Sequence, residues 1–287
     1  MNFDRSAEDI GNVVHLEHVN LRIPDQSIAT RFYVSALGLT RDPYLMTGTD
    51  NMWVNAGRTQ FHLPLGAAQR LRGTVVLVIP GRQALLERLR LAAPSFQQTA
   101  FAFEARADHV ELRCPWGNRL HCLEPEASRP AAMALGIVRL EFDVPPECAQ
   151  GIARFYREVL AAPAAVWSND AGLSVARVRL GAGQSLVFSE TAQPLAAYDG
   201  HHIQVYVADF SGPHRRLQAL GAISEESDPH QYRFLDIVDP QTGAPLFRLE
   251  HEVRSLTHPL FARPLVNRNP AQTNRDYRPG CDAFRPD

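Results

Sequence analysis

The sequence predicts an α+β fold built from four copies of one unit, in which a strand is followed by a helix and three further strands. Two observations carry this prediction. The helical phrase Arg31-Phe32-Tyr33 returns as Arg154-Phe155-Tyr156, each time after a strand in which polar and apolar residues alternate. Units of similar length then divide most of the 287-residue chain, at 12–66, 70–126, 135–191 and 199–255.

The first unit shows the pattern most clearly. Its opening strand places Val19, Leu21 and Ile23 on one face and His18 on the other. Apolar residues at helical spacing then predict a helix over 28–39, which Gly38 is placed to end. Short strands are expected at 44–46, 52–55 and 59–63.

The other units repeat this order with different residues. Their opening strands are expected at 74–79, 138–144 and 201–207, and their closing strands include 117–124 and 246–253. We therefore predict one domain over 12–126, a second over 135–255, and a C-terminal tail over 256–287. The tail is rich in Pro, Asn and Arg, and we expect it to pack on the body or on a neighbouring subunit, with disorder near its end as the alternative.

Composition excludes several classes of protein. Hydrophobic residues make up 45% of the chain, and 29 basic residues against 31 acidic ones give a formal net charge of -2 with no long basic run. Nucleic-acid or membrane-surface binding is therefore not expected. The four cysteines form no CxxC pair, the first residues are polar and acidic, and no apolar run approaches the roughly 18 residues of a membrane span. We expect a cytoplasmic protein with reduced thiols.

The repeat also carries a family resemblance. His18-Val19-Asn20-Leu21, the phrase from Arg31 to Leu39, and Gly117-Asn118-Arg119-Leu120 resemble the vicinal oxygen chelate superfamily, which includes glyoxalases, bleomycin-resistance proteins and extradiol dioxygenases. The resemblance implies that pairs of modules form two cup-shaped mixed sheets with helices outside. It also implies that metal ligands come from the first and last strands of a module.

The candidate ligands in these strands decide between three pairings of modules. First strands offer His18, Thr74, Arg139 or Glu141, and His202, whereas last strands offer His62, His121 or Glu124, Phe188, and Glu250. Pairing the third and fourth modules leaves a position without histidine, and pairing the first and second leaves Thr74 in a ligand position. Only the first and fourth modules together supply two histidines and a carboxylate.

We therefore expect His18, His202 and Glu250 to bind the metal. This layout resembles the ring-cleaving hydroquinone dioxygenases, a branch in which the first and last modules build the iron site. The turn before the last strand is longer than usual, and a slip of one residue would present His251 instead. Alternation favours Glu250, because Phe247 and Leu249 share the opposite face.

Two histidines and one carboxylate suit Fe(II), with Mn(II), Zn(II) or Ni(II) as alternatives. The expected reaction is ring cleavage of a hydroquinone- or catechol-like phenol by dioxygen, without an organic cofactor. The candidate residues for transferring protons in this reaction are His201, His230, Tyr232 and Arg233. A homodimer is compatible with the long tail.

Other interpretations of the same residues remain open. A glyoxalase-type lyase or isomerase would use the metal without dioxygen, but the first module offers no second carboxylate near His62. A metal-free cup that sequesters a small molecule would use His18 and His202 only as hydrogen-bonding groups. His62 and His121 are interpreted as polar lining residues or relics of a second site.

Overall fold

The computed structural model describes residues 3–45, 48–126 and 133–285 and contains the strand-helix-three-strand module four times. The first module consists of β1 (Val13–Asn20), α1 (Gln26–Ala29) continued by the π-helix η2 (Thr30–Ala36), β2 (Thr40–Arg41), β3 (Asn51–Ala56) and β4 (Thr59–Pro64). The second consists of β5 (Gly73–Val78), α2 (Arg82–Ala92), the 3-10 turn η3 (Ala93–Phe96), β6 (Ala102–Ala105), β7 (His109–Arg113) and β8 (Arg119–Leu123).

The last two modules follow the same order. The third consists of β9 (Gly136–Val144), α3 (Ala149–Glu158), β10 (Ala164–Ser168), β11 (Ser174–Leu180) and β12 (Gln184–Glu190). The fourth consists of β13 (His202–Val207), α4 (Ser211–Ala219), β14 (Ile223–Asp228), β15 (Gln231–Val238) and β16 (Pro245–Ser255). A 3-10 turn, η1 (Arg5–Glu8), precedes them. The fourfold repeat is confirmed.

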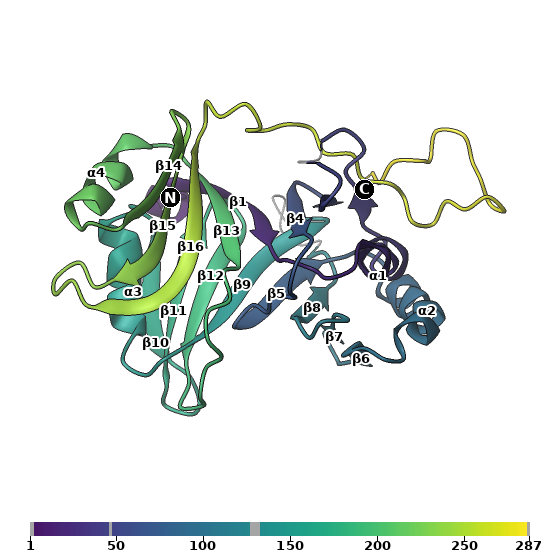
Figure 1. Cartoon of the computed structure of the whole chain (residues 1–287), viewed down its shortest axis with the longest axis horizontal. Helices are drawn as coiled ribbons and strands as arrows, with labels where there is room; N and C mark the ends of the chain where they lie inside the picture. Colours follow the sequence, from purple (N-terminus) through teal and green to yellow (C-terminus); the bar gives the residue numbers. More distant parts are fainter. Residues whose placement is uncertain (1–2, 46–47, 127–132, 286–287) are drawn as a thin grey trace. The chain divides into compact units, whose positions relative to one another are not determined.

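The sixteen strands form two mixed sheets of eight. One sheet has the order β14-β15-β16-β13-β1-β4-β3-β2 and joins the fourth module to the first (Figure 1). The other has the order β10-β11-β12-β9-β5-β8-β7-β6 and joins the third module to the second. The pairs β1 with β4 and β5 with β8 are parallel, whereas the remaining pairs of the first two modules are antiparallel. The predicted α+β class is therefore confirmed.

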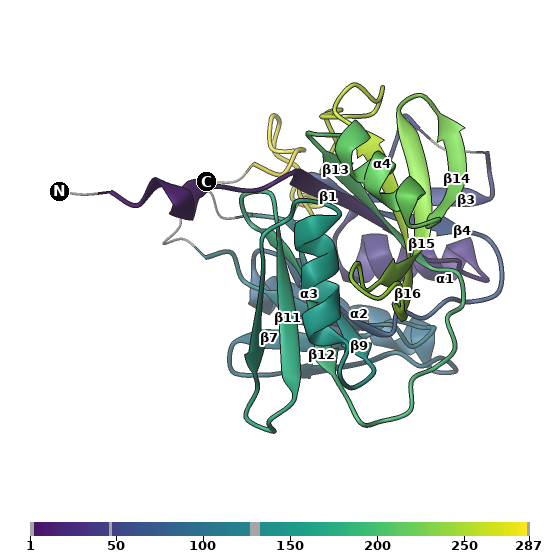
Figure 2. The same ribbon diagram turned by 90° about the vertical axis from the view of Figure 1, so that its left-hand side faces the viewer.

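The repeated helical phrase marks the side of each helix that packs on its sheet. Phe32 and Tyr33 in η2 are buried, as are Phe155 and Tyr156 in α3. Figure 2 shows α3 against β11 and β12, which it contacts. Because an aromatic pair removes a large apolar area from water, it anchors a helix to the face below it.

One predicted strand of the first module is shifted. The second strand is β2 at Thr40–Arg41, and residues 44 and 45 form a turn instead; Met46 lies outside the described residues. The Asp42 carboxylate accepts hydrogen bonds from the backbone N–H groups of Tyr44 and Leu45, each at 2.9 Å. A side chain that satisfies backbone donors in this way competes with strand pairing.

The chain separates into two compact units. One holds most of the third and fourth modules, and the other holds most of the first and second modules together with the tail from Ala262. The boundaries that the sequence suggested at 126 and 135 stay a prediction. Within the described residues, no helix has the length and apolar character that crossing a membrane requires.

The described part of the tail packs on the first module. This agrees with the expectation that the tail packs on the body of the protein. Arg263 Nη2 lies 2.8 Å from Asp42 Oδ2, and Asn55 Nδ2 donates to the carbonyl of Val266 at 2.9 Å. Asn267 exchanges hydrogen bonds with the backbone of Gly57 at 2.9 and 2.8 Å. These contacts tie the described tail to Asp42 after β2, to strand β3 and to the turn that follows β3.

Candidate metal centre

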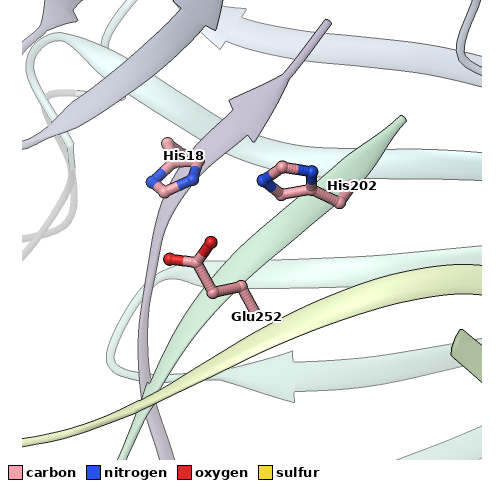
Figure 3. A group of neighbouring side chains, drawn as sticks. All are labelled: His18, His202 and Glu252. Atoms are coloured by element: carbon pink, nitrogen blue, oxygen red, sulfur yellow. The ribbon is translucent and has the colours of Figure 1, made fainter. Parts of the chain in front are cut away.

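Three side chains on neighbouring strands of one sheet lie together in Figure 3. His18 extends from β1, His202 from β13 and Glu252 from β16. Each offers one ligand atom, an imidazole nitrogen or a carboxylate oxygen, and these atoms all lie within 4.8 Å of one another. The residues are only 1%, 8% and 3% exposed. Two imidazoles and one carboxylate can hold a divalent metal and leave coordination positions open.

The carboxylate in this group is not the one that the sequence predicted. Among the described residues, Glu252 is grouped with the two histidines, whereas Glu250 lies with its Oε1 3.5 Å from Arg233 Nη1. Alternation places both glutamates on one face of β16, so the predicted face matches and the position along the strand differs by two residues. Two register shifts between β15 and β16 lie between the turn that joins these strands and the part of β16 that carries the two glutamates. The sequence does not reveal these shifts.

The one-residue slip that would present His251 does not occur. His251 is fully buried on the opposite face of β16, where its ring stacks on Phe234 with centroids 4.3 Å apart. Its Nε2 lies 2.7 Å from the hydroxyl of Tyr156 in α3. Burial lowers the pKa of His251 to about 4. This imidazole is therefore a neutral part of the core beneath α3.

Two arginines contact the Glu252 carboxylate. Arg233, its cross-strand partner on β15, donates to Oε2. Arg254 Nη2 lies 2.6 Å from Oε1, and Arg254 Nε also donates to Gln231 Oε1 at 2.8 Å. A buried carboxylate is costly without partners of opposite charge, so these guanidinium groups favour its ionised form. Arg233, a predicted catalytic residue, thus lies against the candidate ligand.

A second carboxylate orients His18. Glu17 Oε2 lies 3.1 Å from His18 Nδ1, and both residues are buried. When Nδ1 carries the proton and donates a hydrogen bond to Glu17, Nε2 becomes the nitrogen that binds a metal. The sequence analysis did not single out Glu17. Its only signal in the sequence is its position directly before a candidate histidine ligand. Alternation along a strand places adjacent residues on opposite faces and therefore does not predict that Glu17 contacts His18.

His62 stacks on His18 and on Trp53. The ring centroids are 3.7 Å apart for His18 and His62, and 4.1 Å apart for His62 and Trp53. The pairing of β4 with β1 and β3 produces this arrangement, because it places Asn20 beside His62 and Trp53 opposite it. His62 Nε2 lies 3.1 Å from Gln60 Oε1. His62, which the sequence indicated as a polar lining residue, is therefore part of an aromatic stack beside the candidate ligands.

Gln204 is a residue that sequence reasoning missed. It follows His202 by two positions on β13 and shares its face. The side chain is fully buried, and neither Oε1 nor Nε2 has a hydrogen-bond partner within the described part of the chain. Leaving a buried amide unsatisfied costs about 1–3 kcal/mol per group, so such a side chain needs an explanation such as a bound polar molecule. An alternating strand gives no hint of this.

His201 belongs to the loop that leads into β13. Its Nδ1 lies 2.7 Å from Asp199 Oδ1, and Asp199 Oδ2 accepts the backbone N–H of Arg70 at 2.6 Å. Burial alone would raise the pKa of Asp199, but the hydrogen bonds from His201 and from the backbone of Arg70, together with the charge interaction with His201, outweigh it and the pKa is lowered. The pair fixes the backbone from which His202 extends.

The other two predicted catalytic residues are placed away from the face of Arg233. Tyr232 is buried on the opposite face of β15, where its ring packs on Phe210 and on His214 of α4, each with centroids 5.0 Å apart. Burial raises its pKa above the usual range. His230 lies in the turn before β15, with Nδ1 3.2 Å from Thr257 Oγ1. Tyr232 and Arg233 are adjacent in the strand and therefore lie on opposite faces. Only Arg233 shares the face of Glu252.

Comparison with known proteins supports the fold. Neither the comparison with protein-family models nor that with curated proteins finds a match. Among solved structures, a candidate dioxygenase from Bacillus subtilis subsp. subtilis str. 168 is similar, with a TM-score of 0.57 at 15% identity over 88% of this chain and 91% of the other. Glyoxalase I from Zea mays aligns with a TM-score of 0.59 at 12% identity, over 85% and 92% of the two chains.

The chain has the vicinal oxygen chelate fold. The resemblance found in the sequence is thereby confirmed at the level of the fold. At these identities a shared architecture says nothing of the reaction. The chemistry has to be argued from the side chains of this chain, and above all from His18, His202 and Glu252.

Proposed function

We propose that this protein is an Fe(II)-dependent dioxygenase that cleaves the ring of a hydroquinone- or catechol-like phenol. The observation that carries the proposal is the buried group of His18, His202 and Glu252, whose ligand atoms lie within 4.8 Å of one another. Two histidines and one carboxylate, with coordination positions left open, form the donor set of many non-haem Fe(II) oxygenases. Mn(II), Zn(II) or Ni(II) would fit the same donors.

The surroundings of the three residues suit a metal in two ways. Glu17 holds the His18 ring through Nδ1, which resembles the carboxylate-histidine pairs that orient metal ligands. Arg233 and Arg254 place positive charge against the Glu252 carboxylate. A carboxylate has about four lone-pair positions, so hydrogen bonds from arginines do not prevent it from binding a metal as well.

When bound, Fe(II) would supply a centre that binds both dioxygen and an electron-rich phenol and passes electrons between them. The protein's own contribution is to exclude water and to orient the ring. The candidate ligands are nearly inaccessible to solvent, which strengthens electrostatic interactions among them. The stack of Trp53, His62 and His18 places aromatic rings directly beside the candidate ligands.

Gln204 supports a substrate that carries hydroxyl groups. Its buried amide lies two residues after His202 and can both donate and accept a hydrogen bond. A phenolic hydroxyl offers the complementary donor and acceptor. A purely apolar ligand would leave the amide unsatisfied, at a cost of about 1–3 kcal/mol.

The test uses the full chain purified without oxygen and loaded with Fe(II). Oxygen consumption and loss of aromatic absorbance are followed with hydroquinone, catechol and their substituted forms. We expect turnover with at least one of these phenols and its loss in His202→Ala. His214→Ala, which changes a half-exposed histidine of α4 paired with Glu226, serves as the matched control. A chain that binds no iron, or one whose iron binding is unchanged in His202→Ala, would refute the proposal.

A second candidate is a glyoxalase-type lyase or isomerase. The same three donors would hold a metal that acts only as a Lewis acid. Metal-dependent turnover of a hemithioacetal in the absence of oxygen, with no oxygen consumption on the phenol panel, would favour this reaction. Binding of phenols without metal would instead favour a sequestering protein.

A further inference from the structure

A second group of metal-binding side chains lies on the other sheet. His109 and Glu111 extend from β7 and His121 extends from β8. One ligand atom from each lies within 4.8 Å of the other two, and all three residues are half-buried. The group shares no residue with the candidate metal centre. It also lies within a single module, on two strands joined by a short connection.

Strand register explains why these three side chains meet. Glu111 and His121 are direct cross-strand partners, and His109 is paired with Leu123. His109 lies two residues before Glu111 and therefore on the same face, diagonal to His121. The two imidazole centroids are 4.7 Å apart. The group depends only on the pairing of β7 with β8.

The donor atoms are oriented for binding a metal. Asp108 Oδ1 lies 2.7 Å from His109 Nδ1, which favours the tautomer whose lone pair is on Nε2. His109 Nε2 is itself buried and has no hydrogen-bond partner among the residues that the structure describes. Glu111 Oε2 accepts a hydrogen bond from Arg106 at 2.6 Å, and this bond lowers the pKa of Glu111. The carboxylate is therefore ionised at neutral pH.

We propose that His109, Glu111 and His121 form a second divalent-metal site that selects Zn²⁺. Two imidazoles and one carboxylate with a water in the fourth position make a common tetrahedral zinc arrangement. The half-exposed position of the group gives water access to that fourth position. Bound zinc joins β7 to β8 and stabilises this side of the sheet, since a ligand that binds only the folded chain shifts the unfolding equilibrium.

The first experiment measures zinc stoichiometry on the full chain after removal of metal with a chelator. Competition with a chromogenic chelator gives the affinity of each site. We expect two sites in the unchanged chain, one in His18→Ala/His202→Ala, and one in His109→Ala/His121→Ala. Glu104→Gln is the matched control, because Glu104 also pairs with Arg106 but lies outside the group. This variant should keep both sites.

The second experiment uses His18→Ala/His202→Ala as the background, so that only the second site is read. Zinc should raise its unfolding temperature, and Co²⁺ should give the visible absorption of a four-coordinate ion. Both signals should disappear when His121→Ala is added, while the circular dichroism in chelator stays unchanged. Zinc binding and a thermal shift that persist when His109→Ala and His121→Ala are both added to this background would overturn the proposal, as would a background variant that binds no zinc. Neither result bears on the iron site.

Discussion

The two eight-stranded sheets have the same order of modules but carry their histidines in different places. In one sheet the central strands β1 and β13 carry His18 and His202. In the other the corresponding strands β5 and β9 carry Thr74 and Arg139, and the histidines lie further out, on β7 and β8. The first group is buried and the second is half-exposed. Position in the sheet thus decides how much water reaches a site built on this fold.

Removing a central histidine tests whether the two sheets carry separate metal sites. In His202→Ala we expect iron affinity to fall by on the order of 100-fold or more, because the loss of an outer contact alone costs 10–100-fold. His121→Ala should leave iron binding intact. Isothermal titration with Fe(II) under anaerobic conditions measures both. Equal losses in the two variants would mean that the sheets do not carry separate sites.

The carboxylate is tested by a matched pair on one face of β16. Glu252→Ala should cost about 3 kcal/mol in the free energy of unfolding, because it removes the carboxylate that pairs with the buried Arg254, whereas Arg233 keeps its contacts with Glu225 and Glu250. It should also abolish tight iron binding. Glu250→Ala removes a longer and more exposed contact, and we expect a cost below about 1 kcal/mol. Urea unfolding and iron titration compare them, and a larger effect at Glu250 would favour the original sequence prediction.

The opposite face of β16 predicts a pH effect. His251 has a pKa of about 4 when folded and about 6.5 when unfolded, so the unfolded chain binds a proton first as the pH falls. Above pH 6.5 His251 does not lower the free energy of unfolding. Between pH 6.5 and 4, protonation of this residue in the unfolded chain lowers that free energy by up to about 3 kcal/mol. His251→Phe should lose less stability over that range. Urea unfolding at pH 7 and 4.5 gives the difference, and identical pH slopes would contradict the assignment.

The smallest expected effect concerns Glu17. Glu17→Gln keeps the shape but weakens the contact with His18 Nδ1, and iron affinity should fall by about 10-fold. Asp108→Asn is the corresponding change in the other sheet and should weaken only zinc. Metal titrations of both variants measure the pair. A Glu17→Gln chain with unchanged iron affinity would show that the carboxylate does not orient the ring.

Periodicity and repetition were enough to predict the fold. The returning Arg-Phe-Tyr phrase gave the four modules, and alternation put His18 and His202 on the polar faces of their strands. Alternation alone does not distinguish Glu252 from Glu250, because both share a face and the register shifts between β15 and β16 depend on the folded pair. The stacking of His18 on His62 depends on how the strands pair, which the sequence does not give. The lack of a hydrogen-bond partner for the Gln204 amide among the described residues depends on its neighbours in the fold.

The joining of the last module to the first has a consequence for how the protein is made. β1 is synthesised well before its neighbour β13 and before the strand β16 that carries Glu252. The second and third modules, whose strands pair with one another, can complete their sheet before then. Contacts between residues so distant in sequence form slowly. His18 is therefore synthesised well before His202 and Glu252, so the proposed iron site can form only after β16 has been made.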